Sequence, residues 1–358
     1  MAMTRMDREQ FFEKLSALDE DRLKKALWNL YWRGTASVRQ HIEGEIEPGG
    51  PSRRRAEPES VDPARTLSQV SEFADLARSG AYLGGDRRVT PKQRTRWRFT
   101  FRQLAKEVEL ALGNEDVEDG ATAMAVLIDL AREMNGYDYF RSEDPIEAAR
   151  FVVSDEVALL WSRLRDQLGF DEFARRAAPQ LVRWESTFGW TRTGFGQVRA
   201  KETSLAVVLG GMLSVHDAWV TFARQYVEAL DALADQTTTK SRRERYSTER
   251  GPKDRASNLS EWHSMLLDRL WGSEAEGVLD RLSEHPALGG PDLTYFKALL
   301  ADRRGDQATA RRLTTRALDA LPGHEGYLRF AAQIGAPLPA RAEAAARARL
   351  ERLMSNPG

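Results

Sequence analysis

The most prominent side chains that could do chemistry are a run of basic residues between positions 87 and 106. This run contains eight lysines and arginines and no acid, whereas residues 107–119 contain six acids and no base. Arg94, Arg98 and Arg102 recur every four residues, so a helix would place them on one face. Such a face could bind an anion: a phosphate, a nucleic acid or an acidic peptide.

A structural interpretation of the same residues stays open beside this one. In it, the arginines pair with glutamates of a neighbouring helix, and Trp97 and Phe101 belong to the core. In either interpretation the arginines lie near the start of a helix. The helix dipole disfavours positive charge there by about 0.3 to 1 kcal/mol per group. A second basic segment lies further along the chain. The candidate contacts to an anion or nucleic acid are Arg87, Arg88, Arg94, Arg98, Arg102, Arg242, Arg243 and Arg245.

A glycine-rich segment, FGWTRTGFGQ at 188–197, is a second candidate. Glycine-rich turns can bring backbone N–H groups to a phosphate. This segment follows no predicted strand and lacks a Lys-Ser or Lys-Thr pair, so it does not match a phosphate-binding P-loop. Its aromatic residues favour a structural loop.

The histidines and the known catalytic motifs point to no reaction. The five histidines, at positions 41, 216, 263, 285 and 324, include no pair three or four residues apart, so no helix-borne metal site is predicted. His216 precedes Asp217, but adjacent helical residues point in different directions, which favours a hydrogen-bonded structural histidine. No cofactor, metal ligand or catalytic residue is predicted. An enzyme whose site is assembled from distant residues stays an alternative.

The segments that carry these residues are predicted to be helices. A Thr-Pro pair starts a helix predicted over 91–112, and an Asp-Pro pair starts one predicted over 144–168. A central helix, apolar on several sides, is predicted over 204–234. No series of alternating strands is found. The predicted fold class is all-α: a body of packed antiparallel helices followed by a short helical-repeat module.

Two polar segments divide the chain. Residues 47–65 and 237–257 combine proline, glycine and charge without apolar periodicity, and are predicted to be flexible linkers, the second of them basic. In the N-terminal part, the helix predicted over 19–33 has an apolar stripe broad enough to be packed on two sides. The predicted domains are an N-terminal helical hairpin at 1–46, a central helical domain at 66–236 and a C-terminal module at 258–358.

Composition bounds the class of protein. The chain has 358 residues, 41% hydrophobic and 30% charged, which suits more than one folded domain. Its net charge of −1 creates no global attraction to nucleic acid or to a membrane, so any such binding must be local. It contains no cysteine, and no apolar stretch approaches the roughly 20 residues that cross a bilayer. A cytoplasmic location without a membrane partner is predicted, and the many Arg, Ala and Gly residues suggest a bacterial genome.

One segment carries a family resemblance. Residues 292–322 read DLTYFKALLADRRGDQATARRLTTRALDALP, with small residues where two helices would approach and a Gly-Asp pair between them. This pattern resembles a tetratricopeptide repeat (TPR), although Thr314 stands where a large aromatic residue is usual. Similar pairs of helices are predicted at 259–284 and 325–354. The positions that carry the match are Ala298, Gly305, Ala310, Ala317 and Pro322.

The resemblance implies a function. Three stacked units are about the minimum for a stable repeat module, and in the TPR family the concave groove commonly holds a peptide or a partner helix. We therefore expect a non-enzymatic protein-interaction or adaptor protein. The alternative is a nucleic-acid or anion-binding protein that uses the basic helix at 87–106 and the linker at 240–255. The sequence identifies neither the partner nor the oligomeric state.

Overall fold

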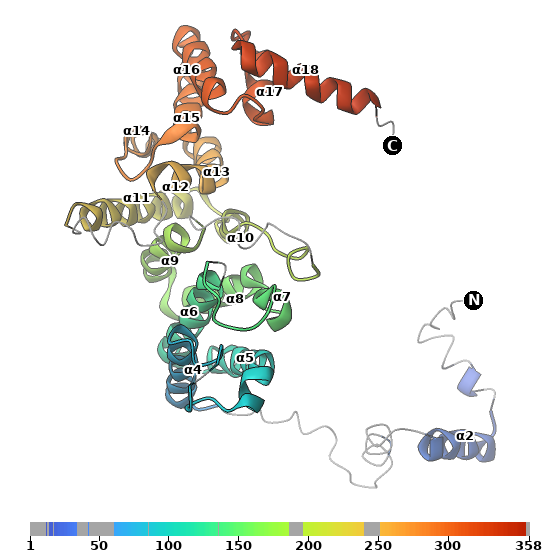
Figure 1. The fold of residues 1–358 in the computed structure, drawn as a ribbon. Helices are drawn as coiled ribbons and strands as arrows, with labels where there is room; N and C mark the ends of the chain where they lie inside the picture. The colour runs from blue at the N-terminus through green and yellow to red at the C-terminus, as the bar shows by residue number, and fades with distance from the viewer. Residues whose placement is uncertain are drawn as a thin grey trace. The chain divides into compact units, whose positions relative to one another are not determined.

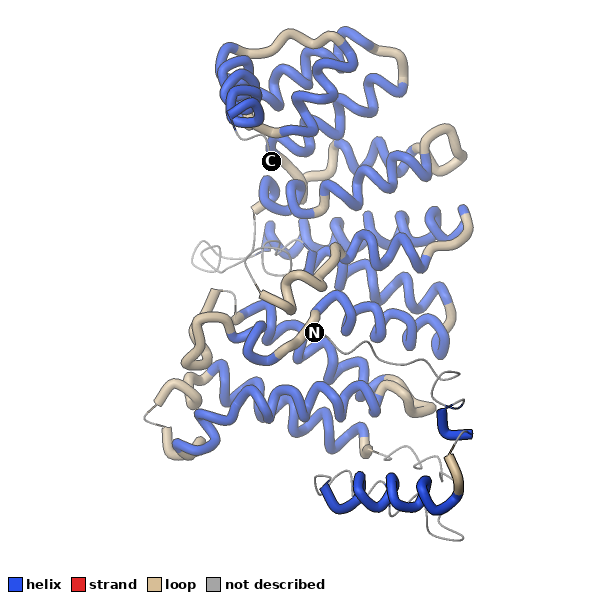
Figure 2. The backbone as a smooth tube through the Cα atoms, turned by 90° about the vertical axis from the view of Figure 1, so that its right-hand side faces the viewer, coloured by secondary structure: helices blue, strands red, loops and turns tan. Residues whose placement is uncertain are grey.

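The structure is a computed structural model of the 358-residue chain. It describes residues 12, 14–16, 18–33, 42, 61–84, 86–134, 136–185, 196–239 and 251–355. Their regular structure is helical and they contain no strand (Figure 2), so the predicted all-α fold class is confirmed. Among these residues, no helix has both the length and the apolar content needed to cross a membrane.

The chain forms two compact units, residues 1–60 and 61–358. In the first unit, α2 spans Glu20–Arg33 and matches the helix predicted there. Its apolar side chains are exposed, and Trp28 stacks on Trp32 with ring centroids 6.0 Å apart. The prediction that this helix is packed on two sides concerns contacts with segments that lie outside the described residues or in the second unit, and it stays a prediction. Most of the rest of the predicted hairpin lies outside them, as does the predicted linker up to residue 60.

The helices of the second unit follow one another in chain order (Figure 1), and each packs on neighbours only a few elements away. They are α4 (Pro63–Arg78), α5 (Pro91–Ala111), α6 (Glu118–Glu133), α7 (Pro145–Ala149), α8 (Val153–Leu168), α9 (Phe170–Glu185), α10 (Leu205–Met212), α11 (His216–Thr239), α12 (Pro252–Asn258), α13 (Ser260–Leu270), α14 (Gly277–Ser283), α15 (Gly290–Arg303), α16 (Gln307–Ala320), α17 (Glu325–Ile334) and α18 (Ala340–Ser355).

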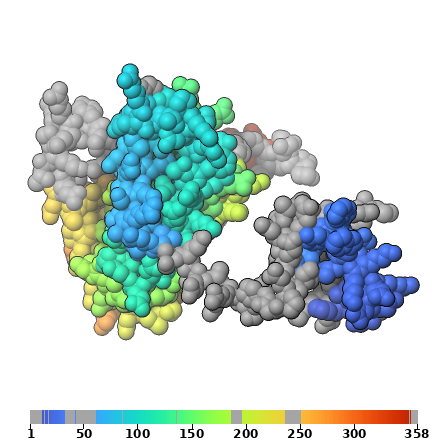
Figure 3. All heavy atoms as spheres, turned by 90° about the horizontal axis from the view of Figure 1, so that it is seen from below, coloured from blue at the N-terminus to red at the C-terminus, as the bar shows by residue number. Residues whose placement is uncertain are grey.

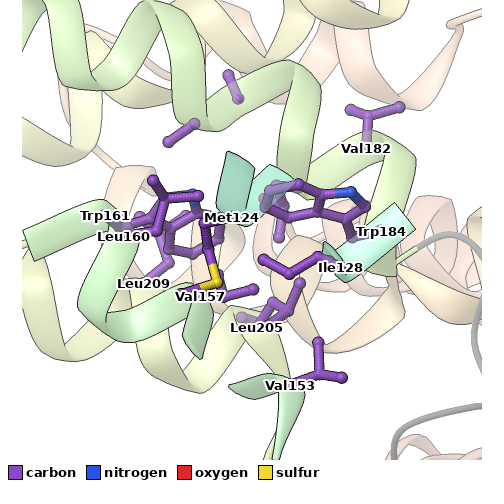
Figure 4. Packing of buried hydrophobic residues seen from close by; sticks show 14 of the residues in the cluster. Met124, Ile128, Val153, Val157, Leu160, Trp161, Val182, Trp184, Leu205 and Leu209 are labelled. Atoms are coloured by element: carbon purple, nitrogen blue, oxygen red, sulfur yellow. The ribbon is translucent and has the colours of Figure 1, made fainter. Parts of the chain in front are cut away.

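A single hydrophobic core runs from Val70 to Leu300 and includes residues of α4 through α15. Figure 4 shows its middle, where apolar side chains of α6, α8, α9 and α10 interlock around two buried tryptophans. Both indole N–H groups find acceptors: Trp161 donates to Gln180 at 2.8 Å and Trp184 donates to Asp129 at 3.1 Å. These hydrogen bonds remove the cost of burying an indole without a partner.

Helix α5, which carries the basic run, begins and ends almost where predicted. Thr90 and Gln93 form a reciprocal capping box at its start. Trp97 and Phe101 are buried, as the structural interpretation of the basic run expected. At Gly120 of α6, an added Cβ would lie 2.9 Å from the backbone nitrogen of Leu112, so only glycine permits this approach of the two helices.

Two helices that were predicted to be continuous are each divided into two in the structure. The helix expected over 144–168 ends at Arg150, whose left-handed φ of 55° separates α7 from α8. Glu202, distant in sequence, accepts hydrogen bonds from the backbone N–H groups of Val153 and Ser154 at 2.6 and 2.9 Å, and so caps a new helix start. The helix expected over 204–234 is divided between Met212 and His216, and the indole of Trp219 donates to a carbonyl of the break at 2.8 Å.

Both predicted linkers contain helix at their C-terminal ends. Asp62 caps α4, which begins three residues before the predicted boundary at 66. Residues 252–257, assigned to the basic linker at 237–257, lie in α12. Arg255 of α12 is 7% exposed and donates to the carbonyl of Ala287, which ties α12 to the segment before α15. That part of the flexible-linker prediction was wrong, because a buried arginine bound to a distant carbonyl orders it.

The C-terminal hairpins follow the predicted pattern closely. Helices α15 and α16 pack on each other, and Gly305 between them has a φ of +77°. Asp306 caps α16 by accepting from the backbone N–H of Thr309 at 3.0 Å. Thr314 is fully buried, and its hydroxyl donates to the carbonyl of Ala310 at 2.8 Å. The predicted helix–turn–helix at 292–322 is confirmed, with buried alanines Ala298, Ala310 and Ala317 at the helix contact.

Candidate functional site

The predicted anion-binding arginines have divided roles in the structure. Arg94 donates to the backbone carbonyl of Asp86. Arg102 donates from Nε to the carbonyl of Ala149 at 3.0 Å and from Nη2 to that of Ala148 at 2.5 Å. Both guanidinium groups therefore bind backbone oxygens, and the glutamates of a neighbouring helix are not their partners. Arg102 neutralises the negative end of α7.

Arg88 has a carboxylate partner on its own loop. Its guanidinium lies 2.6 Å from Asp86 Oδ2, and Arg88 lowers the pKa of the Asp86 carboxyl to about 2, chiefly through this side-chain hydrogen bond. Arg87 is exposed beside it. Arg98 lies on the solvent side of α5, over the ring of Phe99. Arg242, Arg243 and Arg245 of the second basic segment lie outside the described residues.

The glycine-rich segment ends in an anion site that the chain fills itself. Residues 188–195 lie outside the described part. Directly after them, the backbone N–H groups of Gln197 and Val198 each donate to the Glu147 carboxylate at 2.9 Å. Backbone N–H groups at the end of this segment do bind an anion, but the anion is a carboxylate of α7. This position is structural.

The histidines occupy unrelated positions. His216 is exposed at the start of α11, so the expectation of a hydrogen-bonded structural histidine there was wrong. His263 is buried against Tyr226, with Nε2 2.8 Å from the tyrosine oxygen, and burial lowers its pKa to about 3. His285 Nδ1 accepts from the backbone N–H of Ala287, so Nε2 carries the proton that is donated to Asp231 at 3.0 Å.

Sequence reasoning missed a cleft of about 180 Å³ in the C-terminal hairpins. Its walls come from α13, α15 and the start of α17, three helices that alternate along the chain with α14 and α16. Three segments far apart in the chain thus build one concave surface. The residues that line it are Ser260, Glu261, His263, Ser264, Asp292, Tyr295, Phe296, Leu299, His324 and Tyr327.

The aromatic rings of this cleft support one another. The rings of Tyr295 and Tyr327 have centroids 4.4 Å apart, and His324 lies 3.9 Å from Tyr327. The phenol of Tyr327 donates to Asp292 Oδ1 at 2.6 Å. Burial, followed by the neighbouring Asp292 carboxylate, raises the pKa of Tyr327. The phenol therefore stays protonated at neutral pH and holds the carboxylate in place.

Acidic side chains line the cleft. Its lining includes the carboxylates of Glu261 and Asp292 and contains no lysine or arginine. Burial keeps the imidazole of His263 neutral at physiological pH, so this histidine does not offset the two acids. Aromatic rings beside carboxylates make attractive contacts with the apolar stem and the charged head of a lysine or arginine side chain.

A second acidic cluster lies in the body. Burial, together with the charges of Glu109, Asp155 and Glu202, raises the pKa of Glu156 to about 8. Within the described residues, no group of three or more histidine or acidic side chains is arranged to hold a metal ion. The chain matches no protein-family model, no curated protein and no solved structure.

Proposed function

We propose that this chain is a non-enzymatic interaction protein, located in the cytoplasm, whose helices α13 to α18 form a TPR-like module. The observation that supports this function most directly is the cleft lined by α13, α15 and α17. In the family that the sequence resembles, the first helices of successive repeats face the groove that receives a peptide or a partner helix. The order of helices around this cleft agrees with that arrangement.

The number and spacing of the helices support the same proposal. Three pairs, α13–α14, α15–α16 and α17–α18, fall in the region of the resemblance. A single pair cannot bury its apolar face, and about three are needed for stability. The last two pairs, α15–α16 and α17–α18, share a second apolar cluster that includes Tyr327, Phe330 and Ile334. A rigid groove of this kind loses little entropy on binding a segment.

The chemistry of the cleft defines the occupant. Two carboxylates and several aromatic rings favour a segment of a partner protein that inserts a lysine or arginine side chain. The Tyr327 phenol fixes one oxygen of Asp292, which leaves the other for the incoming cation. We therefore propose a partner segment with a basic anchor residue.

The test is a selection of displayed random peptides on the immobilised full-length chain. Ser264 is exposed on the cleft wall, so Ser264→Arg adds bulk and positive charge without touching the core. The matched control is Ser68→Arg, on the exposed side of α4. We expect peptides with a shared lysine or arginine position that bind the wild type and the control but lose at least about tenfold in affinity with Ser264→Arg.

Two outcomes would overturn the proposal. One is a selection without a shared motif, or with a motif that binds Ser264→Arg as tightly as the wild type. The other is a motif whose anchor is acidic, because a carboxylate would then enter a cleft that already holds two. Circular dichroism and urea unfolding of each variant separate loss of binding from loss of fold.

A further inference from the structure

Helix α5 carries an exposed aromatic side chain outside the face that packs into the core. Phe99 is 48% exposed, whereas Trp97 and Phe101 beside it are buried. Three arginines surround its ring: the guanidinium carbons of Arg96, Arg98 and Arg102 lie 6.0, 4.9 and 5.5 Å from the ring centroid. Helices α4 and α5, light blue to cyan, form much of the face that Figure 3 presents.

A fourth arginine joins this group through the break after α7. The carbonyls of Ala148 and Ala149 hold the guanidinium of Arg102 next to Arg150. Arg150 is exposed, and it is the one non-glycine residue of the described chain with a positive φ. The pKa of Arg102 is lowered by burial and then by the positive charges of Arg150 and Arg98. The fold therefore holds these cations close together despite their repulsion.

Within the part of the chain that the structure describes, no carboxylate pairs with this charge. The ion pairs found in the described parts of the chain involve none of Arg96, Arg98, Arg102 and Arg150. Elsewhere the arginines find acids: on α9, for example, Arg176 lies 2.7 Å from Glu118. Three cations around an exposed ring, with a fourth beside Arg102, are therefore complementary to an anion that also offers a flat apolar face.

We propose that Phe99 with Arg96, Arg98, Arg102 and Arg150, the Phe99 arginine surface, binds single-stranded nucleic acid. An unpaired base stacks on the Phe99 ring or on an arginine plane, and the remaining guanidinium groups contact adjacent phosphates. A duplex hides the faces of its bases, and an acidic peptide makes no use of the ring. The surface omits Arg94 and Arg88, which bind Asp86, and adds three residues that the sequence did not single out.

The experiment is a fluorescence-anisotropy titration of the full-length chain with a labelled oligothymidine, at low and then rising salt. Phe99→Ala removes the stacking surface, and Phe99→Trp enlarges it. The double variant Arg98→Ala/Arg150→Ala removes two charges, and Arg312→Ala/Arg316→Ala removes two exposed arginines of α16 as the matched control. Arg102 is left unchanged because it holds the end of α7.

We expect salt-sensitive binding that weakens on the order of tenfold with Phe99→Ala and with the Arg98/Arg150 double variant, and that is retained by Phe99→Trp and by the α16 control. The slope of log affinity against log salt should fall in magnitude by about one to two in the Arg98/Arg150 variant. This result does not depend on the peptide groove.

Several results would overturn the proposal. They are binding absent at low salt, binding indifferent to Phe99→Ala, or an equal loss in the α16 control. A duplex of the same sequence that binds as tightly would reduce the surface to a nonspecific phosphate contact. Polyglutamate that competes as well as unlabelled oligothymidine would assign the surface to an acidic protein instead. Circular dichroism confirms that each variant is folded.

Discussion

The C-terminal cleft and the Phe99 arginine surface are opposites in charge and in construction. The cleft is concave, is lined by two carboxylates and draws its residues from α13, α15 and α17. The arginine surface is exposed, and all but one of its residues belong to α5. Aromatic rings occur in both. The two proposed functions therefore call for ligands of opposite charge, a basic side chain in the cleft and a polyanion on the arginine surface.

The largest loss of stability is expected from Trp262→Ala, which should damage the cleft and spare the arginine surface. Trp262 is fully buried, stacks on Trp219 with centroids 5.5 Å apart and also meets Phe222 and Tyr226, so it fastens α13 to α11. Loss of this side chain should lower the free energy of unfolding by about 3 to 5 kcal/mol, measured by urea denaturation. At temperatures where the variant stays folded, oligothymidine binding should persist. Equal loss of both activities would contradict two separable surfaces.

Gly120→Ala should weaken the arginine surface and leave the cleft unchanged. Its new Cβ would lie 2.9 and 3.0 Å from backbone atoms of Leu112 and Ala111, so α5 and α6 must move apart. We expect a loss of about 1 to 3 kcal/mol in unfolding free energy and weaker binding of oligothymidine, with peptide binding at the cleft unchanged. The control is Gly277→Ala, where a Cβ meets nothing within 4 Å. A result in which both glycine variants behave alike would show that α5 needs no close support.

The pH dependence of stability should reveal Glu156, which belongs to neither surface. Its folded pKa of about 8 exceeds the ordinary 4.5, mainly because of burial. Between these values the folded chain keeps a proton that the unfolded chain has lost, so stability falls as pH rises from 4.5 to 8.

Glu156→Gln should therefore match the wild type below pH 4.5 and exceed it by about 1 kcal/mol or more above pH 8. Urea denaturation across this range is the measurement, and Asp319→Asn on α16 is the control for loss of an exposed carboxylate. Oligothymidine binding should change little over the same range because arginines stay protonated. A wild type that gains stability with pH relative to Glu156→Gln would contradict the buried position of this group.

The smallest effect on stability is expected from Asp292→Asn, which changes the cleft alone. The amide still accepts the hydrogen bond of the Tyr327 phenol but carries no charge. Stability should fall by about 1 kcal/mol or less, while binding of a basic-anchored peptide weakens by about tenfold or more. Calorimetric titration of a selected peptide is the measurement. Unchanged affinity would show that the carboxylate positions Tyr327 and does not meet the ligand.

Local signals in the chain predicted much of the fold. The Thr90-Pro91 pair and the turn at Gly305 each specify a helix boundary within a few residues, and both boundaries were placed correctly. The boundaries that failed depend on distant groups. Glu202 caps α8, and Arg255 orders α12, so residues nearby in sequence hold no sign of either. These side chains act only after the helices have packed.

For the candidate sites, the sequence alone determined the spacing of the arginines and the helical structure of the segments that carry them. Both follow from the helical repeat, which places residues four apart on one face whatever surrounds them. Only the tertiary structure decided how the arginines are divided: Arg94 donates to the Asp86 carbonyl and lies outside the Phe99 arginine surface, whereas two carbonyls hold Arg102 within it. It also decided that Asp292, Tyr327 and Ser264 share one cleft, because that contact requires three helices to stack.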